Sequence, residues 1–174
     1  VKDTRLALGQ LAKWLREKIN PKTVAMTGSS GKTTVKEMTA SILQQSAVDF
    51  DDVLFTHGNF NNDIGVPLTL LRLTEQHKFA VIELGANHIG EIAYTTALAQ
   101  PDVALVNNVA AAHLEGFGSL DDVATAKGEI YRGLTSNGTA IINLAHNYQQ
   151  KWQAEIGDHS VQYFAYDNPQ ADYY

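Results

Sequence analysis

Seven consecutive residues near the start of the chain have the types and spacing of a phosphate-binding loop. They are Gly28, Ser29, Ser30, Gly31, Lys32, Thr33 and Thr34. Glycines let a backbone turn tightly and point its N–H groups at phosphate oxygens, and a following helix adds the positive end of its dipole. Lys32 can then reach the outer phosphates of ATP, and the hydroxyl of Thr33 can bind Mg²⁺. A glycine-rich turn that merely joins a strand to a helix is the alternative, and the directly following Lys-Thr-Thr argues against it.

Glu83 stands inside an apolar run, residues 79–84, that has the character of a buried strand. A carboxylate near the end of such a strand is unfavourable unless it meets a cation. In parallel α/β sheets, ligands bind beside the carboxyl ends of the strands. Glu83 is therefore a candidate Mg²⁺ ligand, directly or through water. The alternative is a glutamate at a strand end that reaches solvent.

Lys127 lies within the apolar stripe of a helix predicted for residues 120–134. The stripe is formed by Val123, Ala126, Ile130 and Leu134. A lysine on a core-facing stripe needs a counter-charge or a chemical task, unless its long stem carries the ammonium group to solvent. Glu129 falls off the stripe and is expected to be solvated.

Two further polar residues are weaker candidates. His113 follows a predicted strand at 103–106 across a loop of small residues, where a structural role and a role in a site are both open. Asn62 belongs to a polar segment, residues 59–67, that leads into a predicted helix at 68–73. From the residues alone, a turn with a helix N-cap is favoured there over a polar ligand cleft.

The remaining pattern predicts an α/β fold, with a mostly parallel sheet flanked by helices in the manner of P-loop NTPases. Near-continuous apolar strands alternate with amphipathic helices, as in sheets that are covered on both faces. Strands are predicted at 23–26, 79–84, 103–106 and 139–142, and helices at 4–19, 33–45, 68–73, 90–99 and 120–134, with another helix after the last strand. The first helix has an apolar stripe formed by Leu8, Leu11, Ala12, Leu15 and Ile19.

Composition excludes several classes of protein. The chain has 174 residues, of which 44% are hydrophobic and 18% charged, as in one soluble globular domain. Its net charge of −6 argues against a nucleic-acid-binding surface. There is no cysteine, hence no disulfide or thiolate metal site. No apolar run is long enough to span a membrane and no signal-peptide pattern is present, so we expect a cytoplasmic protein without membrane insertion.

Taken together, the motifs resemble those of the Mur ligases, the ATP-dependent amide-forming enzymes of peptidoglycan precursor synthesis. The matching segments are residues 24–34, 58–67, 81–87, 112–119 and 126–130. The first segment is shared across the superfamily. Three other segments are similar to those of the family member that acts last in peptidoglycan precursor synthesis. They are Asn-Asn-Asp-Ile-Gly-Val-Pro, Glu-Leu-Gly-Ala-Asn and His-Leu-Glu-Gly-Phe-Gly-Ser.

This resemblance implies roles for the candidate residues. Lys32 and the loop amides would hold the β- and γ-phosphates of ATP, and Asn62 would lie near them. Thr33 and Glu83 would bind one Mg²⁺. His113 would bind a second Mg²⁺ near the acyl substrate.

The lysine that matches Lys127 is commonly carbamylated in the family, which turns a cation into a carboxylate-like group that helps to position the second metal. Family members have three domains. The resemblance therefore implies that residues 1–22 are a linking helix and residues 23–174 a C-terminally incomplete central ATP-binding domain. The UDP-binding N-terminal domain and the Rossmann-like C-terminal domain would be absent.

The implied reaction joins D-alanyl-D-alanine to UDP-N-acetylmuramoyl-tripeptide through an acyl phosphate, with ATP as the phosphoryl donor. We expect this chain alone to bind nucleotide weakly at most and to have no ligase activity. The alternatives are another ligase of the superfamily, such as a different Mur step or folylpolyglutamate synthase, an unrelated P-loop NTPase or kinase, and a non-catalytic nucleotide-binding module.

Overall fold

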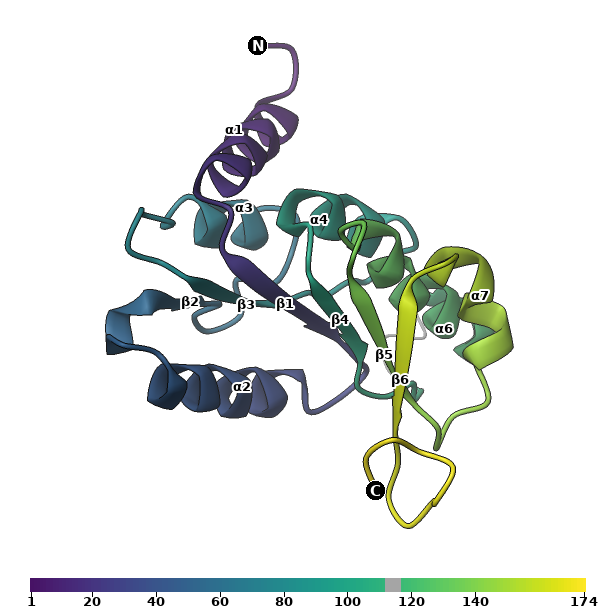
Figure 1. The fold of residues 1–174 in the computed structure, drawn as a ribbon. Helices are drawn as coiled ribbons and strands as arrows, with labels where there is room; N and C mark the ends of the chain where they lie inside the picture. Colours follow the sequence, from purple (N-terminus) through teal and green to yellow (C-terminus); the bar gives the residue numbers. More distant parts are fainter. Residues whose placement is uncertain (112–116) are drawn as a thin grey trace.

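A computed structural model describes residues 1–111 and 117–174 and contains a six-stranded, entirely parallel sheet (Figure 1). The strands are β1 (Lys22–Thr27), β2 (Val53–Phe55), β3 (Phe79–Glu83), β4 (Val103–Val106), β5 (Thr139–Asn143) and β6 (Ser160–Phe164). Their order across the sheet is β2-β3-β1-β4-β5-β6. Chain order reverses at β1, between β3 and β4, and such a switch point is where ligands bind in open α/β sheets. The predicted fold class is confirmed.

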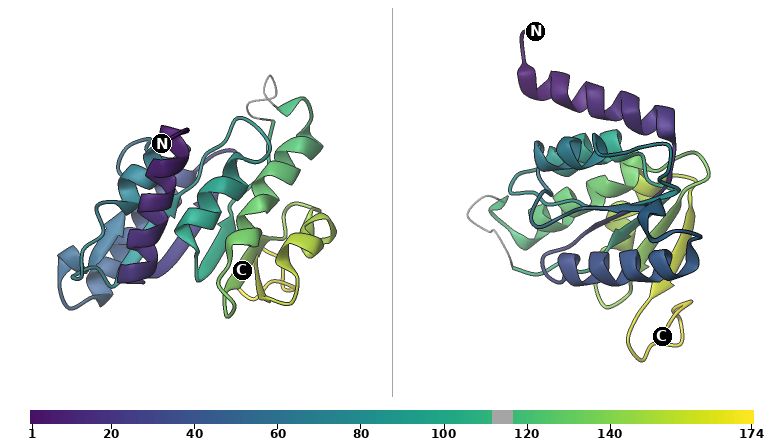
Figure 2. Two further views of the ribbon diagram at one scale, coloured as in Figure 1. Left: turned by 90° about the horizontal axis from the view of Figure 1, so that it is seen from above. Right: turned by 90° about the vertical axis from the view of Figure 1, so that its left-hand side faces the viewer.

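The helices form layers on the two faces of this sheet. They are α1 (Thr4–Ile19), α2 (Lys32–Ser46), α3 (Gly65–Leu70), α4 (Glu91–Ala99), α6 (Leu120–Gly128) and α7 (Gln149–Ile156), with the 3₁₀ helices η1 (Phe50–Asp52) and η2 (Glu129–Gly133). Figure 2 shows α2 on one side of the sheet and α3 and α4 on the other, with α1 packed outside them. In the described part of the chain, no helix combines the length and the apolar character that crossing a membrane requires.

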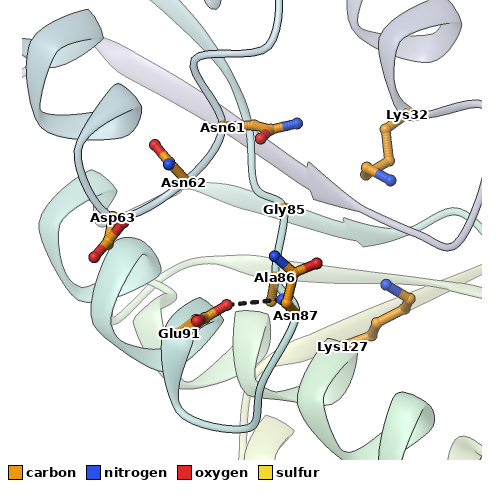
Figure 3. Close-up of a pocket in the computed structure, with 9 residues that line it drawn as sticks. All are labelled: Lys32, Asn61, Asn62, Asp63, Gly85, Ala86, Asn87, Glu91 and Lys127. Atoms are coloured by element: carbon orange, nitrogen blue, oxygen red, sulfur yellow. Dashed lines mark hydrogen bonds between the residues drawn. The ribbon is translucent and has the colours of Figure 1, made fainter. Parts of the chain in front are cut away.

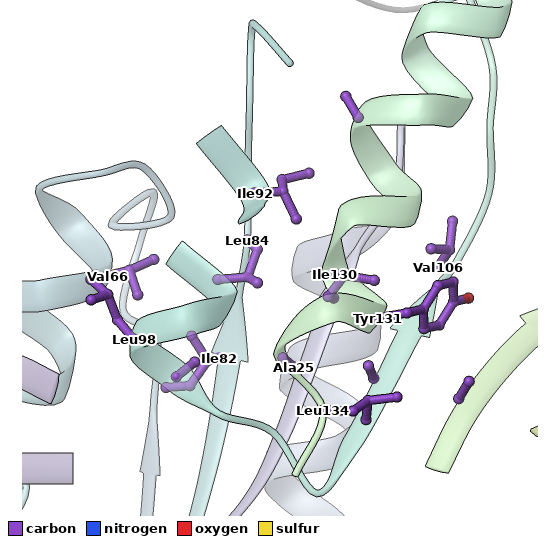
Figure 4. Packing of buried hydrophobic residues seen from close by; sticks show 14 of the residues in the cluster. Ala25, Val66, Ile82, Leu84, Ile92, Leu98, Val106, Ile130, Tyr131 and Leu134 are labelled. Carbon is purple, nitrogen blue, oxygen red and sulfur yellow. The ribbon is translucent and has the colours of Figure 1, made fainter. Parts of the chain in front are cut away.

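Two apolar cores hold these layers together. The larger core fills the space between the sheet and the helices α3, α4, α6, η2 and α7, and part of it is shown in Figure 4. The smaller core lies under α2 and includes Met26, Ala40, Val53 and Val81. Met26 is thus a core residue, which explains why an apolar side chain precedes the phosphate-binding loop.

The structure corrects three of the predicted helices. In α1, Leu11 is 52% exposed, whereas Gly9 and Arg16 are buried. The helix predicted at 68–73 begins three residues earlier, at Gly65. The helix predicted for 120–134 ends as an α-helix at Gly128 and continues as η2. The strands β2 and β6 were not predicted, because β2 has only three residues and β6 is a half-exposed edge strand.

Candidate functional site

The loop of residues 28–34 joins the end of β1 to the start of α2, as the phosphate-binding pattern requires. Gly31 caps α2 with a φ of +71°, a left-handed conformation that favours glycine. A Cβ atom at Gly28 would lie 3.1 Å from Cβ of Asn107, so a larger residue there would require the neighbouring loop to move by a few tenths of an ångström. Both glycines therefore have a steric reason to stand where they do.

A second loop, which follows β4, holds the phosphate-binding loop in place. The backbone N–H of Ser30 donates to Oδ1 of Asn108 at 3.0 Å, and that of Ser29 donates to the Asn108 carbonyl at 3.1 Å. The Asn107 amide donates to the carbonyl of Ser30 at 2.9 Å. Sequence reasoning did not single out these two asparagines. The sequence feature that could have identified them as site residues is their position directly after a strand that lies next to β1.

Glu83 is buried, with 2% of its surface exposed, and its two carboxylate oxygens have different partners. The hydroxyl of Thr33 donates to Oε2 at 3.0 Å, and the side-chain amide of Asn61 donates to Oε1 at 2.7 Å. In the sheet Glu83 lies beside Met26, one residue before β1 ends. The alternative of a solvated strand end is therefore wrong, and the structure brings Thr33 and Glu83 together.

Lys32 folds back onto its own loop. Its Nζ donates to the carbonyl of Gly28 at 2.7 Å. Burial lowers the pKa of this lysine, and the nearby charge of Glu83 acts in the opposite direction. The ammonium group thus occupies the loop that would receive a phosphate, and it is held there by a backbone carbonyl.

Lys127 does not reach solvent, because only 3% of its surface is exposed. Burial, together with the positive charge of Lys32, lowers its pKa to about 8. Both lysines line a cavity of about 220 Å³ (Figure 3). The other lining residues are Asn61, Asn62, Asp63, Gly85, Ala86, Asn87 and Glu91. Two cations thus approach one cavity from different elements. Of the two carboxylates that also line it, Asp63 is paired with Arg5 and Glu91 accepts the backbone N–H groups of Asn87 and His88, so the lysines are the charges left to bind an anionic ligand.

The two remaining candidates differ in what can be said of them. Asn62 lines the cavity, but its Oδ1 accepts the backbone N–H of Gly65 at 2.8 Å, as in the turn-and-cap interpretation. Its neighbour Asn61 is the one that reaches Glu83. His113 lies outside the described residues.

Glu129 corrects the sequence prediction, because it is buried and not solvated. Its carboxylate accepts the backbone N–H of Gly90 at 2.7 Å and that of Ala93 at 3.0 Å. Glu129 does not belong to the apolar stripe, and it contacts the N-terminal end of α4, whose free N–H groups and dipole favour a negative charge. Glu129 thus ties the segment that carries Lys127 to the start of α4.

The described residues contain no group of three or more His, Cys, Asp and Glu side chains that could hold a metal ion. The two oxygen donors beside the phosphate-binding loop that were predicted to bind Mg²⁺, those of Thr33 and Glu83, lie 3.0 Å apart. Adjacent ligands of an octahedral Mg²⁺ with bonds of about 2.0–2.1 Å are separated by about 2.9 Å. The pair fits this cation in both chemistry and spacing.

Comparison with known proteins gives a consistent result. The Mur ligase middle domain matches residues 26–174. UDP-N-acetylmuramoyl-tripeptide–D-alanyl-D-alanine ligase of Haemophilus influenzae is 76% identical over 164 residues, which are 94% of this chain and 36% of that protein. The Escherichia coli protein of the same name is 58% identical over 173 residues, covering 99% of this chain and 37% of its own length. The chain thus spans about a third of these curated relatives.

Solved structures agree. A structure of MurF from Acinetobacter baumannii superposes with a TM-score of 0.89 at 47% identity, over 94% of this chain and 36% of that one. The MurF ligase of Thermotoga maritima, solved in complex with ADP, superposes with a TM-score of 0.84 at 30% identity, over 97% and 38% of the two chains. The family model covers far more than half of the sequence. This chain belongs to the Mur ligase middle domain family.

Proposed function

We propose that this chain is the ATP-binding part of an amide ligase that joins D-alanyl-D-alanine to UDP-N-acetylmuramoyl-tripeptide. The observation that carries the proposal is the arrangement of charges at one cavity. Lys32 and Lys127 line it, and Asn61, which also lines it, is hydrogen bonded to the carboxylate of Glu83. The identities of 76% and 58% to relatives of that name support the choice of substrates.

The complete reaction belongs to a longer protein. Since the chain spans about a third of its curated relatives, we place residues 1–22 as a linking helix and residues 23–174 within the central domain. A UDP-binding domain and a Rossmann-like domain that supplies the amine would complete the enzyme.

Phosphate binding is assigned to the loop of residues 28–34. Its backbone N–H groups and the N-terminal end of α2 would bind the β- and γ-phosphates. Lys32 would exchange the carbonyl of Gly28 for a phosphate oxygen. Thr33 and Glu83 would hold one Mg²⁺, which supplies positive charge that offsets the charge on the transferring phosphoryl group.

Lys127 is assigned to the acyl side of the site. A pKa of about 8 leaves about a quarter of its side chains neutral at pH 7.5, against about one in a thousand at the ordinary value. The neutral amine is the form that reacts with carbon dioxide, so this environment favours carbamylation. The carbamate would act with His113 to position a second Mg²⁺.

The chemistry requires two steps. A carboxylate oxygen of the tripeptide attacks the γ-phosphorus of ATP, which forms an acyl phosphate and releases ADP. The amine of D-alanyl-D-alanine then attacks the acyl carbon, and phosphate leaves as the amide forms. Lys32 would stabilise negative charge on the phosphoryl oxygens during the first step, which is the main catalytic task in phosphoryl transfer.

The test uses the full-length protein that carries this chain. Lys32→Ala should abolish ATP turnover, whereas Lys18→Ala, on the exposed side of α1, should leave it unchanged. Near-normal turnover of the Lys32 variant would refute the assignment of the loop. Faster reaction with single amino acids than with D-alanyl-D-alanine would indicate another ligase of the superfamily. Nucleotide binding without amide formation would indicate a non-catalytic module.

A further inference from the structure

The carboxylate of Glu83 can serve the site only if β3 and α2 keep a fixed separation. Thr33 lies in the first turn of α2, and Glu83 ends β3, a strand that neither begins nor ends in the phosphate-binding loop. The two oxygens that would share Mg²⁺ are 3.0 Å apart and come from these separate elements. The smaller core packs α2 against β3, and a hydrogen-bonded connection between α2 and the end of β3 would fix their separation further.

Lys36 is the side chain that makes this connection. It lies one helical turn after Lys32 and is completely buried, with 0% of its surface exposed. Lysine is almost never fully buried unless its charge is paired. Its Nζ donates to the backbone carbonyl of Thr56 at 2.7 Å and lies 2.6 Å from a carboxylate oxygen of Glu37.

Thr56 forms the hydrogen bonds that continue this connection to β3. It follows the last residue of β2, and its backbone N–H donates to the carbonyl of Val81 at 3.0 Å. Its hydroxyl oxygen, fully buried, accepts the backbone N–H of Glu83 at 3.0 Å. Hydrogen bonds thus lead from the ammonium of Lys36, through one threonine, to the backbone of the candidate metal ligand.

We propose that Lys36 and Thr56 are positioning residues that set the affinity of the site for Mg²⁺ by fixing Glu83 relative to Thr33. Their connection to the site runs through the backbone of Glu83, whose N–H donates to the Thr56 hydroxyl, so each acts through Glu83. The inference rests on the proposed function for the identity of the ligand. The hydrogen-bonded connection itself does not depend on it.

The two residues offer well-matched variants. Thr56→Val removes the hydroxyl that accepts the Glu83 N–H and keeps the shape of the side chain, whereas Thr56→Ser keeps the hydroxyl. Lys36→Met removes the ammonium group and keeps most of the length. Because a buried lysine can be needed for folding, the comparison of the two Thr56 variants carries the test if Lys36→Met does not fold.

The first measurement is amide hydrogen exchange in the ligand-free, full-length protein. Exchange at Glu83 should be faster in Thr56→Val than in Thr56→Ser, which should resemble the wild type. The second is the binding of a fluorescent ATP analogue with Mg²⁺ and in EDTA. The Mg²⁺ affinity should fall by about 10–100-fold in Thr56→Val and Lys36→Met, as for other outer-shell partners, with nucleotide binding in EDTA unchanged.

Three results would overturn the inference. Equal behaviour of Thr56→Val and Thr56→Ser in both measurements would show that the hydroxyl does not position Glu83. An equal loss of affinity with Mg²⁺ and in EDTA would indicate a general structural role. A wild-type protein that binds no nucleotide would refute the proposed function and the Mg²⁺ role with it, and the exchange measurement would still show whether the connection exists.

Discussion

Replacing Lys127 by methionine should make the folded chain more stable at neutral pH. In the folded state this lysine is buried beside the positive charge of Lys32, which lowers its pKa from 10.5 to about 8. The unfolded chain has no such environment. At pH 7 folding therefore forces a charge into an unfavourable site, and methionine fills similar space without that charge.

The size of the effect follows from the change in pKa. A fall from 10.5 to about 8 corresponds to about 3 kcal/mol, at about 1.4 kcal/mol per pKa unit. Because the folded pKa is the lower one, this destabilisation is complete below pH 8. It fades between pH 8 and 10.5, where the folded lysine has lost its proton and the unfolded lysine still holds one. By pH 9.5 the advantage of Lys127→Met should shrink to about 1 kcal/mol.

Urea unfolding of this chain and of Lys127→Met at pH 7 and 9.5 measures the difference directly. Buffers free of bicarbonate keep the lysine unmodified, and Lys18→Met, on the exposed side of α1, controls for the loss of any lysine. Two results would refute the reasoning: a variant that is less stable than the wild type at pH 7, or a difference between them that is the same at both pH values.

Three further outcomes follow from other contacts. Gly128→Ala should lower the free energy of unfolding by about 1–3 kcal/mol, since its Cβ would lie 2.2 Å from the buried ring of Trp152; an unchanged urea midpoint would contradict this. Arg16→Met should lower the free energy of unfolding by about 2–5 kcal/mol, because the two backbone carbonyls at the end of α4 lose their buried donor. The resistance of α1 to protease should fall in parallel, and unchanged cleavage would refute the contact. In bicarbonate-free buffer at pH 8, where Lys127 is unmodified, nucleotide binding should take up protons, because the phosphates raise the pKa of Lys127. The uptake would appear as a dependence of the calorimetric enthalpy on the buffer and should be lost in Lys127→Met. Equal proton uptake in both proteins would exclude Lys127 as the source.

Much of the fold could be predicted because its signals are local. Apolar strands β1, β3, β4 and β5 are buried in a parallel sheet, so each appears in the sequence as a short, nearly continuous apolar run. The edge strand β6 escaped prediction because its residues are half-exposed and its composition is mixed. Gly128, the last residue of α6, packs closely against Trp152, and this contact between residues distant in the sequence leaves no local signal.

The candidate site was predictable in part, for the same reason. Lys32, Thr33 and Glu83 belong to motifs whose chemistry can be recognised in a few consecutive residues. The role of Glu129 depends on where α4 begins relative to η2, and helical periodicity contains no information about that packing. Likewise, choosing Asn61 over Asn62 as the partner of Glu83 requires the backbone path of a turn.

The distribution of hydrogen bonds in the site indicates what a ligand must change. Glu83 already has a donor on each oxygen, so for the Thr33 and Glu83 oxygens to bind one metal ion the Thr33 hydroxyl would turn its hydrogen away from Oε2. Lys32, by contrast, is satisfied by the carbonyl of Gly28 and must leave it to meet a phosphate. Lys127 gains most from an anion, because its charge is disfavoured both by burial and by Lys32. An anion between the two lysines would relieve their repulsion. The free energy that burial of these charges costs would then contribute to the binding affinity for a phosphate or carboxylate.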